Sequence, residues 1–112
     1  MRTQFLTSLT ALACGALLAL NTAFAAENHK AEALKHAEAA VTSSKAGDAK
    51  AVSEHAGAAK VHAEAAEKEK ASPHYEAAIK SLDGAIEHGN MGHVDIAGKS
   101  AEEAVTHLKA AP

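Results

Sequence analysis

Residues 72–94 have the sequence SPHYEAAIKSLDGAIEHGNMGHV, which contains the start, the apolar face and the end of one helix. Ser72 is a favourable N-cap, and Pro73 suits the first helical position, where no backbone N–H is needed. The larger apolar side chains follow at intervals of four, three and four residues: Tyr75, Ile79, Leu82 and Ile86. This spacing predicts one apolar face of an α-helix. The glycines after His88 predict the turn that ends it.

The same organisation extends through the rest of the chain, which is rich in Ala, Glu and Lys and therefore favours helix. Turn signals at residues 45–48, 71–73 and 89–92 separate four predicted helices, over residues 27–44, 48–70, 73–88 and 93–110. Short turns between long helices favour antiparallel neighbours. We therefore expect an all-α protein, an up-down-up-down four-helix bundle.

The predicted core is thin because Ala fills many of its positions. Larger apolar residues supply the rest: Leu34 and Val41 in the first helix, Val52 and Val61 in the second, and Val94, Val105 and Leu108 in the fourth. Such a core offsets the ordering entropy of the chain only narrowly. A bound ligand would stabilise the bundle by mass action.

The N-terminal residues have the features of an export signal. Arg2 is followed by an uncharged apolar run over residues 5–20, and small residues precede a cleavage point after Ala25. We expect residues 1–25 to be a cleaved signal peptide and residues 26–112 to be the periplasmic domain, with no membrane insertion after cleavage. A lipoprotein-type cut at Cys14 is the alternative. A cut after Ala26 would instead make His29 the third residue. The terminal amine, two backbone amides and the His29 imidazole would then form a square-planar site for Cu(II) or Ni(II).

Composition excludes several classes of function. The formal net charge of −3 lacks the excess of positive charge that is typical of nucleic-acid-binding proteins. No catalytic triad with its motif context and no glycine-rich phosphate loop is present in the sequence, so we expect no enzyme. Removal of Cys14 with the signal would leave no thiol, so a metal site would use imidazole, carboxylate, thioether or backbone ligands.

A shift of 45 residues aligns the second half of the chain with the first and indicates a two-fold internal repeat. His29 then aligns with His74, and His62 aligns with His107. The other four histidines align with serine or aspartate: His36 with Ser81, His55 with Ser100, His88 with Ser43, and His93 with Asp48. These positions lie seven residues apart within each helix, a step that returns to nearly the same face. Each helix therefore carries one stripe of such positions.

Imidazole is the commonest protein ligand for transition metals, and all eight histidines are candidate ligands. No two histidines are four residues apart, so sites must form between helices, with carboxylates, or at turns. Three local candidates follow from the spacing: Glu32 with His29 or His36, Glu103 with His107, and the turn that contains His88, Met91 and His93. Such ligands favour Cu(II), with Zn(II) and Ni(II) bound more weakly.

Three segments carry a resemblance to a known family: residues 35–41 (KHAEAAV), 88–94 (HGNMGHV) and 103–108 (EAVTHL). With them, the chain resembles the small metal-binding protein family of nitrifying bacteria. The resemblance implies a periplasmic, histidine-rich four-helix bundle of heptad-like repeats that binds several copper ions. It also implies that all eight histidines match the family's histidine register, from which Ser43, Asp48, Ser81 and Ser100 depart.

The sequence thus predicts a non-catalytic, monomeric periplasmic protein that buffers or scavenges divalent transition metals, chiefly copper. The alternative is a periplasmic helical stress protein without a specific metal, in which the eight histidines gain charge together as the pH falls.

Overall fold

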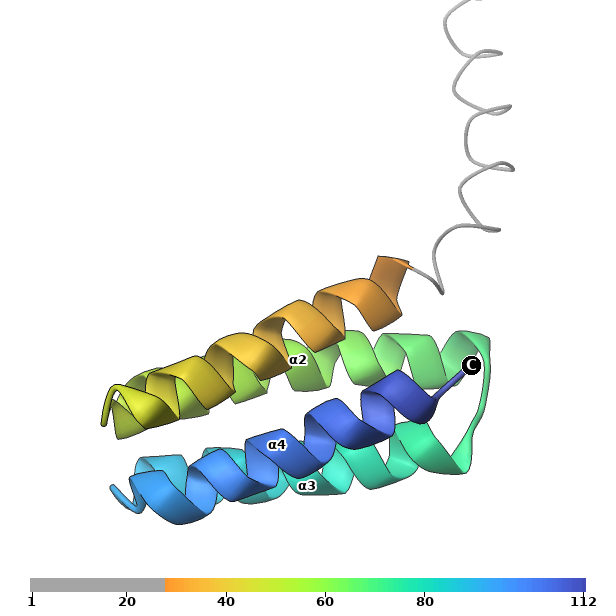
Figure 1. The fold of residues 1–112 in the computed structure, drawn as a ribbon. Helices are drawn as coiled ribbons and strands as arrows, with labels where there is room; N and C mark the ends of the chain where they lie inside the picture. The colour runs from red at the N-terminus through yellow and green to blue at the C-terminus, as the bar shows by residue number, and fades with distance from the viewer. Residues whose placement is uncertain (1–27) are drawn as a thin grey trace, which may run out of the picture.

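The computed structural model describes residues 28–112, and these residues form a four-helix bundle. The first helix occupies residues 28–45, and α2 (Ala49–Glu69), α3 (Pro73–Asn90) and α4 (Val94–Ala110) follow it. In Figure 1 the first helix and α2 form an upper, N-terminal hairpin, and α3 and α4 form a lower, C-terminal hairpin. The predicted all-α up-down bundle is confirmed, and its helix ends differ from the predicted ones by one or two residues.

The predicted signal peptide, Cys14, the two cleavage points and the predicted helix start at Glu27 lie outside the described residues. Within residues 28–112, no helix is both long enough and apolar enough to cross a membrane.

The turns and caps form where the sequence predicts them. Gly47 and Gly92 adopt φ values of 76° and 78°, a left-handed conformation that favours glycine. The Asp48 side chain caps α2 by accepting from the Ala51 N–H at 3.0 Å. Ser72 caps α3 in the same way, but His93 occupies the N-cap of α4 without a side-chain cap bond.

Within residues 28–112, alanine makes up most of the buried core, and only four large side chains are fully buried: Tyr75, Leu82, Leu108 and Val52. The prediction that Val61 belongs to this core is wrong, because its side chain is 65% exposed. Val61 follows Val52 by nine residues, or two and a half helical turns, so the two side chains lie on opposite faces of α2. Ala59 and Ala63 occupy the buried face there instead.

The two hairpins approach each other closely at two glycine–serine contacts. A Cβ atom added at Gly98 would overlap the Ser44 side chain, and one at Gly89 would lie 2.9 Å from the Ala49 carbonyl oxygen and 3.0 Å from the Ser53 Cβ. Each serine hydroxyl also crosses to the other hairpin: Ser44 Oγ donates to the Val94 carbonyl and Ser53 Oγ to the Ile86 carbonyl, both at 3.1 Å. Small residues therefore let the two hairpins pack closely against each other.

Candidate metal centre

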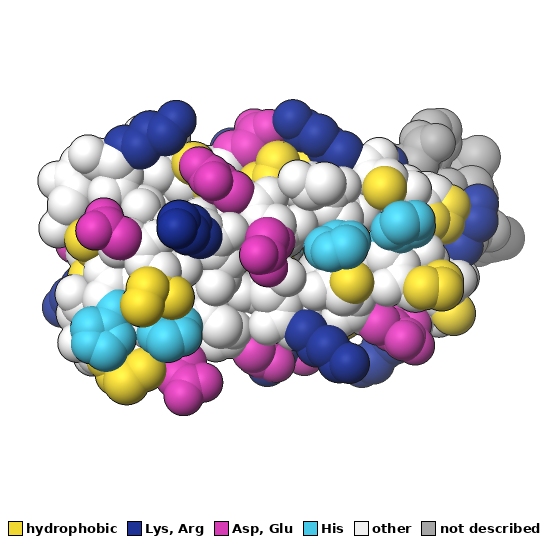
Figure 2. Space-filling model, turned by 60° about the horizontal axis from the view of Figure 1, so that its bottom comes forward, with side chains coloured by type: hydrophobic (Ala, Val, Ile, Leu, Met, Phe, Trp, Pro, Cys, Tyr) yellow, Lys and Arg dark blue, Asp and Glu magenta, His cyan; other side chains and the backbone are white. Residues whose placement is uncertain are grey.

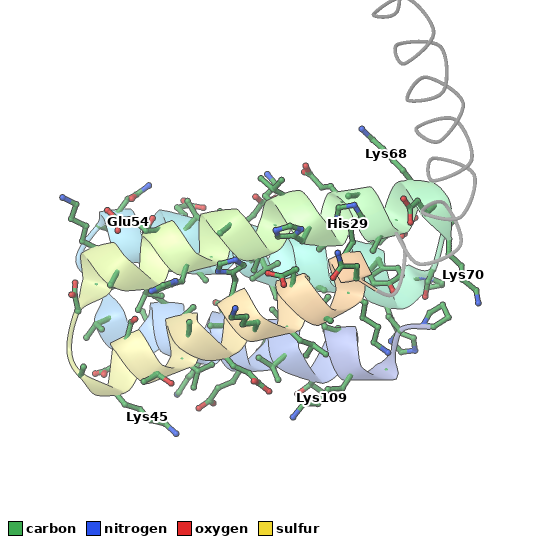
Figure 3. The ribbon with its side chains drawn as sticks, turned by 90° about the horizontal axis from the view of Figure 1, so that it is seen from above. His29, Lys45, Glu54, Lys68, Lys70 and Lys109 are labelled. Carbon is green, nitrogen blue, oxygen red and sulfur yellow. The ribbon has the colours of Figure 1, made fainter. Side chains whose placement is uncertain are left out.

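Four histidines of the N-terminal hairpin line up between its two helices. His29 and His36 belong to the first helix, and His55 and His62 belong to α2. The ring centroids are 5.4 Å apart for His29 and His62, 5.7 Å for His36 and His62, and 6.3 Å for His36 and His55. We call these four histidines, together with Glu32 of the first helix, the imidazole ladder. Figure 3 shows His29 at one end of it, where the first helix lies beside α2.

The ladder arises from the antiparallel register of the hairpin. A step of seven residues along the first helix is matched by a step of seven residues back along α2, so successive histidines meet across the interface. The sequence contained part of this signal, because both helices that flank the turn at Gly47 carry two histidines seven residues apart. The periodicity predicts one stripe of histidine positions on each helix, but it does not predict that the stripes of the first helix and α2 face each other.

Potential ligand atoms of the ladder approach the spacing that a metal ion requires. Glu32, His36 and His62 each place one such atom within 4.8 Å of the others. The Glu32 Oε2 and His36 Nε2 atoms are 3.9 Å apart, and the Nδ1 atoms of His29 and His62 are 3.1 Å apart. Two ligands that are each about 2.0–2.1 Å from one ion at a right angle are about 3 Å apart. Small rotamer adjustments would therefore gather three ligands around one ion.

The ladder is partly open to solvent. The side chains of Glu32 and His36 are 38% and 30% exposed, and His29, His55 and His62 are half-buried. This intermediate exposure limits the cost of moving ions from water to the site and leaves a path for their entry.

The C-terminal hairpin holds its histidines as two separate pairs. The ring centroids of His74 and His107 are 6.0 Å apart, and those of His88 and His93 are 5.8 Å apart. Figure 2 shows two histidine patches well separated on the face made by α3 and α4. Among the residues that the structure describes, Glu32, His36 and His62 form the only group of three His, Cys, Asp or Glu ligands within 4.8 Å of one another, so neither pair has a third such ligand within that distance.

The other predicted candidates are placed as follows. Glu103 is exposed on α4, outside any such group of three in residues 28–112. The turn brings the rings of His88 and His93 together, and Met91 beside them is 51% exposed. The buried His88 Nδ1 atom has no hydrogen-bond partner within the described part of the chain. The spacing thus correctly placed Glu32 beside His36, and it did not anticipate that His62 of α2 would join them.

Two other groups have shifted pKa values. A hydrogen bond to Asp83, together with the charge of that carboxylate, raises the pKa of Lys60, whose Nζ lies 2.6 Å from Asp83 Oδ1 between α2 and α3. Burial raises the pKa of Tyr75, and the charge of Glu67 adds to this shift. Neither group belongs to the histidine sites.

Comparison with known families gives one match over almost the whole chain. The model of the small metal-binding protein family matches residues 3–111. A comparison with curated proteins found no match.

Proposed function

We propose that this chain, which belongs to the small metal-binding protein family, binds divalent transition metal ions through the imidazole ladder and chiefly takes up Cu(II). The observation that carries the proposal is the convergence of Glu32, His36 and His62 within 4.8 Å, from two helices that pack side by side. The family match supports metal binding.

The donor set supports copper. The ladder offers imidazole nitrogens and one carboxylate, and the only cysteine in the sequence, Cys14, lies in the predicted signal peptide. Without thiolate, the relative affinities of such a site follow the Irving–Williams order, in which Cu(II) exceeds both Ni(II) and Zn(II). We therefore expect Zn(II) and Ni(II) to bind at the same residues more weakly.

The role that we propose is that of a periplasmic buffer or scavenger which acts as a monomer. Half-buried imidazoles at the surface of a small bundle suit repeated uptake and release of ions. The export-signal features of residues 1–25 support the periplasmic location. The metal ion is the cargo in this account and is not a catalytic cofactor.

Metal binding also couples to stability. An ion held by Glu32, His36 and His62 would cross-link the first helix to α2 in a bundle whose core is mostly alanine. An ion that binds only the folded state stabilises it by about 2.7 kcal/mol at one hundred times its dissociation constant. We expect the melting temperature to rise with added Cu(II).

Isothermal titration calorimetry with Cu(II) and Zn(II) tests the proposal. We expect wild type to bind Cu(II) more tightly than Zn(II), and the His36→Ala/His62→Ala variant to lose the tightest Cu(II) site. His74→Ala/His107→Ala is the matched control, because it removes the same number of imidazoles from the C-terminal hairpin, and it should keep the tightest Cu(II) site. Equal Cu(II) binding by wild type and the double variant would overturn the assignment of the ladder.

A further inference from the structure

We infer that the two hairpins hold metal in two different ways: the imidazole ladder retains its ion, and the two pairs of the C-terminal hairpin exchange theirs. This inference rests on the proposed function. It concerns where in the bundle an ion is held firmly and where a competing ligand removes it.

The two hairpins differ at three of the five positions that build the ladder. At a shift of 45 residues, His29 and His62 are matched by His74 and His107. The other three ladder positions lose their ligands: Glu32 is matched by Ala77, His36 by Ser81, and His55 by Ser100. The C-terminal hairpin therefore keeps the counterparts of His29 and His62 and lacks those of Glu32, His36 and His55.

The loss leaves each C-terminal pair to act alone. His74 and His88 are two seven-residue steps apart on α3, a rise of about 21 Å, so no ion can be shared between the pairs. An ion held by two imidazoles keeps open coordination positions, which are filled by water or by a competing ligand. The exposed side chains of His74 and His93 give such a ligand access to one ring of each pair.

In the ladder, by contrast, more than two ligands lie close enough to hold one ion. His62 contacts both His29 and His36, and Glu32 lies within reach of the same ion. An ion released by one ligand there has other ligands beside it, so it rebinds before it leaves. Loss of an ordering or coordinating group costs metal affinity on the order of tenfold or more. We therefore expect the ladder to fill first and to empty last.

Reciprocal exchange of the three differing positions tests this division. Ala77→Glu/Ser81→His/Ser100→His would complete a ladder in the C-terminal hairpin, and Glu32→Ala/His36→Ser/His55→Ser would leave His29 and His62 as an isolated pair. The Ser100 side chain lies over Gly84, which has no Cβ atom to oppose a larger side chain at residue 100. Helical content by circular dichroism checks that each variant folds.

The readout is the release of Cu(II) from loaded full-length protein to excess EDTA, followed by stopped-flow absorbance. Wild type should show a fast and a slow phase that differ in rate by about tenfold or more. The Glu32→Ala/His36→Ser/His55→Ser variant should lose the slow phase, and the Ala77→Glu/Ser81→His/Ser100→His variant should gain slow amplitude at the expense of the fast phase. A single phase in wild type, or phases that neither exchange alters, would overturn the inference.

A second measurement, made on the wild-type protein, tests whether the ladder fills before the C-terminal pairs. In wild type, NMR signals of the histidine rings followed during a Zn(II) titration should shift first for His36 and His62 and last for His74 and His93. Simultaneous shifts in both hairpins would overturn the inference while leaving metal binding intact. The absence of any binding would instead refute the proposed function.

Discussion

The Nδ1 atoms of His29 and His62 lie 3.1 Å apart, although 33 residues separate the two histidines in the chain. At this distance one ring donates its N–H and the other accepts. The same spacing suits two neighbouring ligands of one metal ion. The hydrogen bond therefore holds the two rings of the metal-free protein near the separation at which an ion would bind them.

His62 should be the most important single residue for metal binding. It contacts His29 and His36 and lies within ligand reach of Glu32, whereas the one ring contact of His55 recorded in residues 28–112 is with His36. We expect His62→Ala to weaken the tightest Cu(II) site about tenfold or more, and His55→Ala to weaken it less. Calorimetric titration of both variants measures this difference. Equal losses would contradict the central place of His62 in the ladder.

His93→Asp should stabilise the bundle while it removes a metal ligand. Asp48, which aligns with His93 at a shift of 45 residues, caps α2 through the Ala51 N–H, and His93 makes no such bond to α4. A favourable N-cap contributes about 1 kcal/mol. We expect the free energy of unfolding in urea, measured without metal, to rise by about that amount. An unchanged or lower value would show that the aspartate does not cap α4.

Gly98→Ala should destabilise the protein because the new methyl group would overlap the Ser44 side chain where the hairpins meet. Overpacking of this kind costs about 1–3 kcal/mol. Gly57→Ala is the matched control, since a Cβ at this α2 position meets nothing within 4 Å. Alanine is the better helix former there, so this variant should gain up to about 1 kcal/mol. Thermal unfolding of both variants checks the opposite signs.

The single tyrosine should report alkaline unfolding. Burial raises the pKa of Tyr75 above its ordinary value of 10.0, and its hydroxyl donates to the Pro112 carbonyl oxygen at 2.6 Å. Folding favours the neutral phenol, so its contribution to stability is complete below about pH 10 and is lost as the pH rises through the pKa of the folded state. Because the sequence has one Tyr and no Trp, absorbance at the phenolate band follows this group alone. A midpoint at or below 10.0 would contradict the burial argument.

Local signals predicted the fold well. Ser72, Pro73 and the two turn glycines fix helix ends through short-range bonding, and these ends agree with the structure to within one or two residues. The size of the Val61 side chain favours burial, but its position around the helix, half a turn away from the face of Val52, exposes it. Ala59 and Ala63 follow the buried face, and in a bundle this small they pack more closely than a valine would.

The candidate site could be predicted only in part. The pairing of Glu32 with His36 depends on spacing within one helix and was predictable. The contacts that add His29 and His62 depend on how the first helix and α2 are rotated toward each other, which the periodicity of one helix does not fix. The close approach of Gly98 to Ser44 is likewise a contact between hairpins, with no local signature.

The position of the first bound ion tests the account most directly. Crystals of the protein loaded with one equivalent of Cu(II) can be measured at the copper absorption edge, where anomalous scattering locates the metal. We predict the strongest anomalous peak among the side chains of Glu32, His36 and His62. A strongest peak at His74 and His107, at His88 and His93, or away from all histidines would contradict the account.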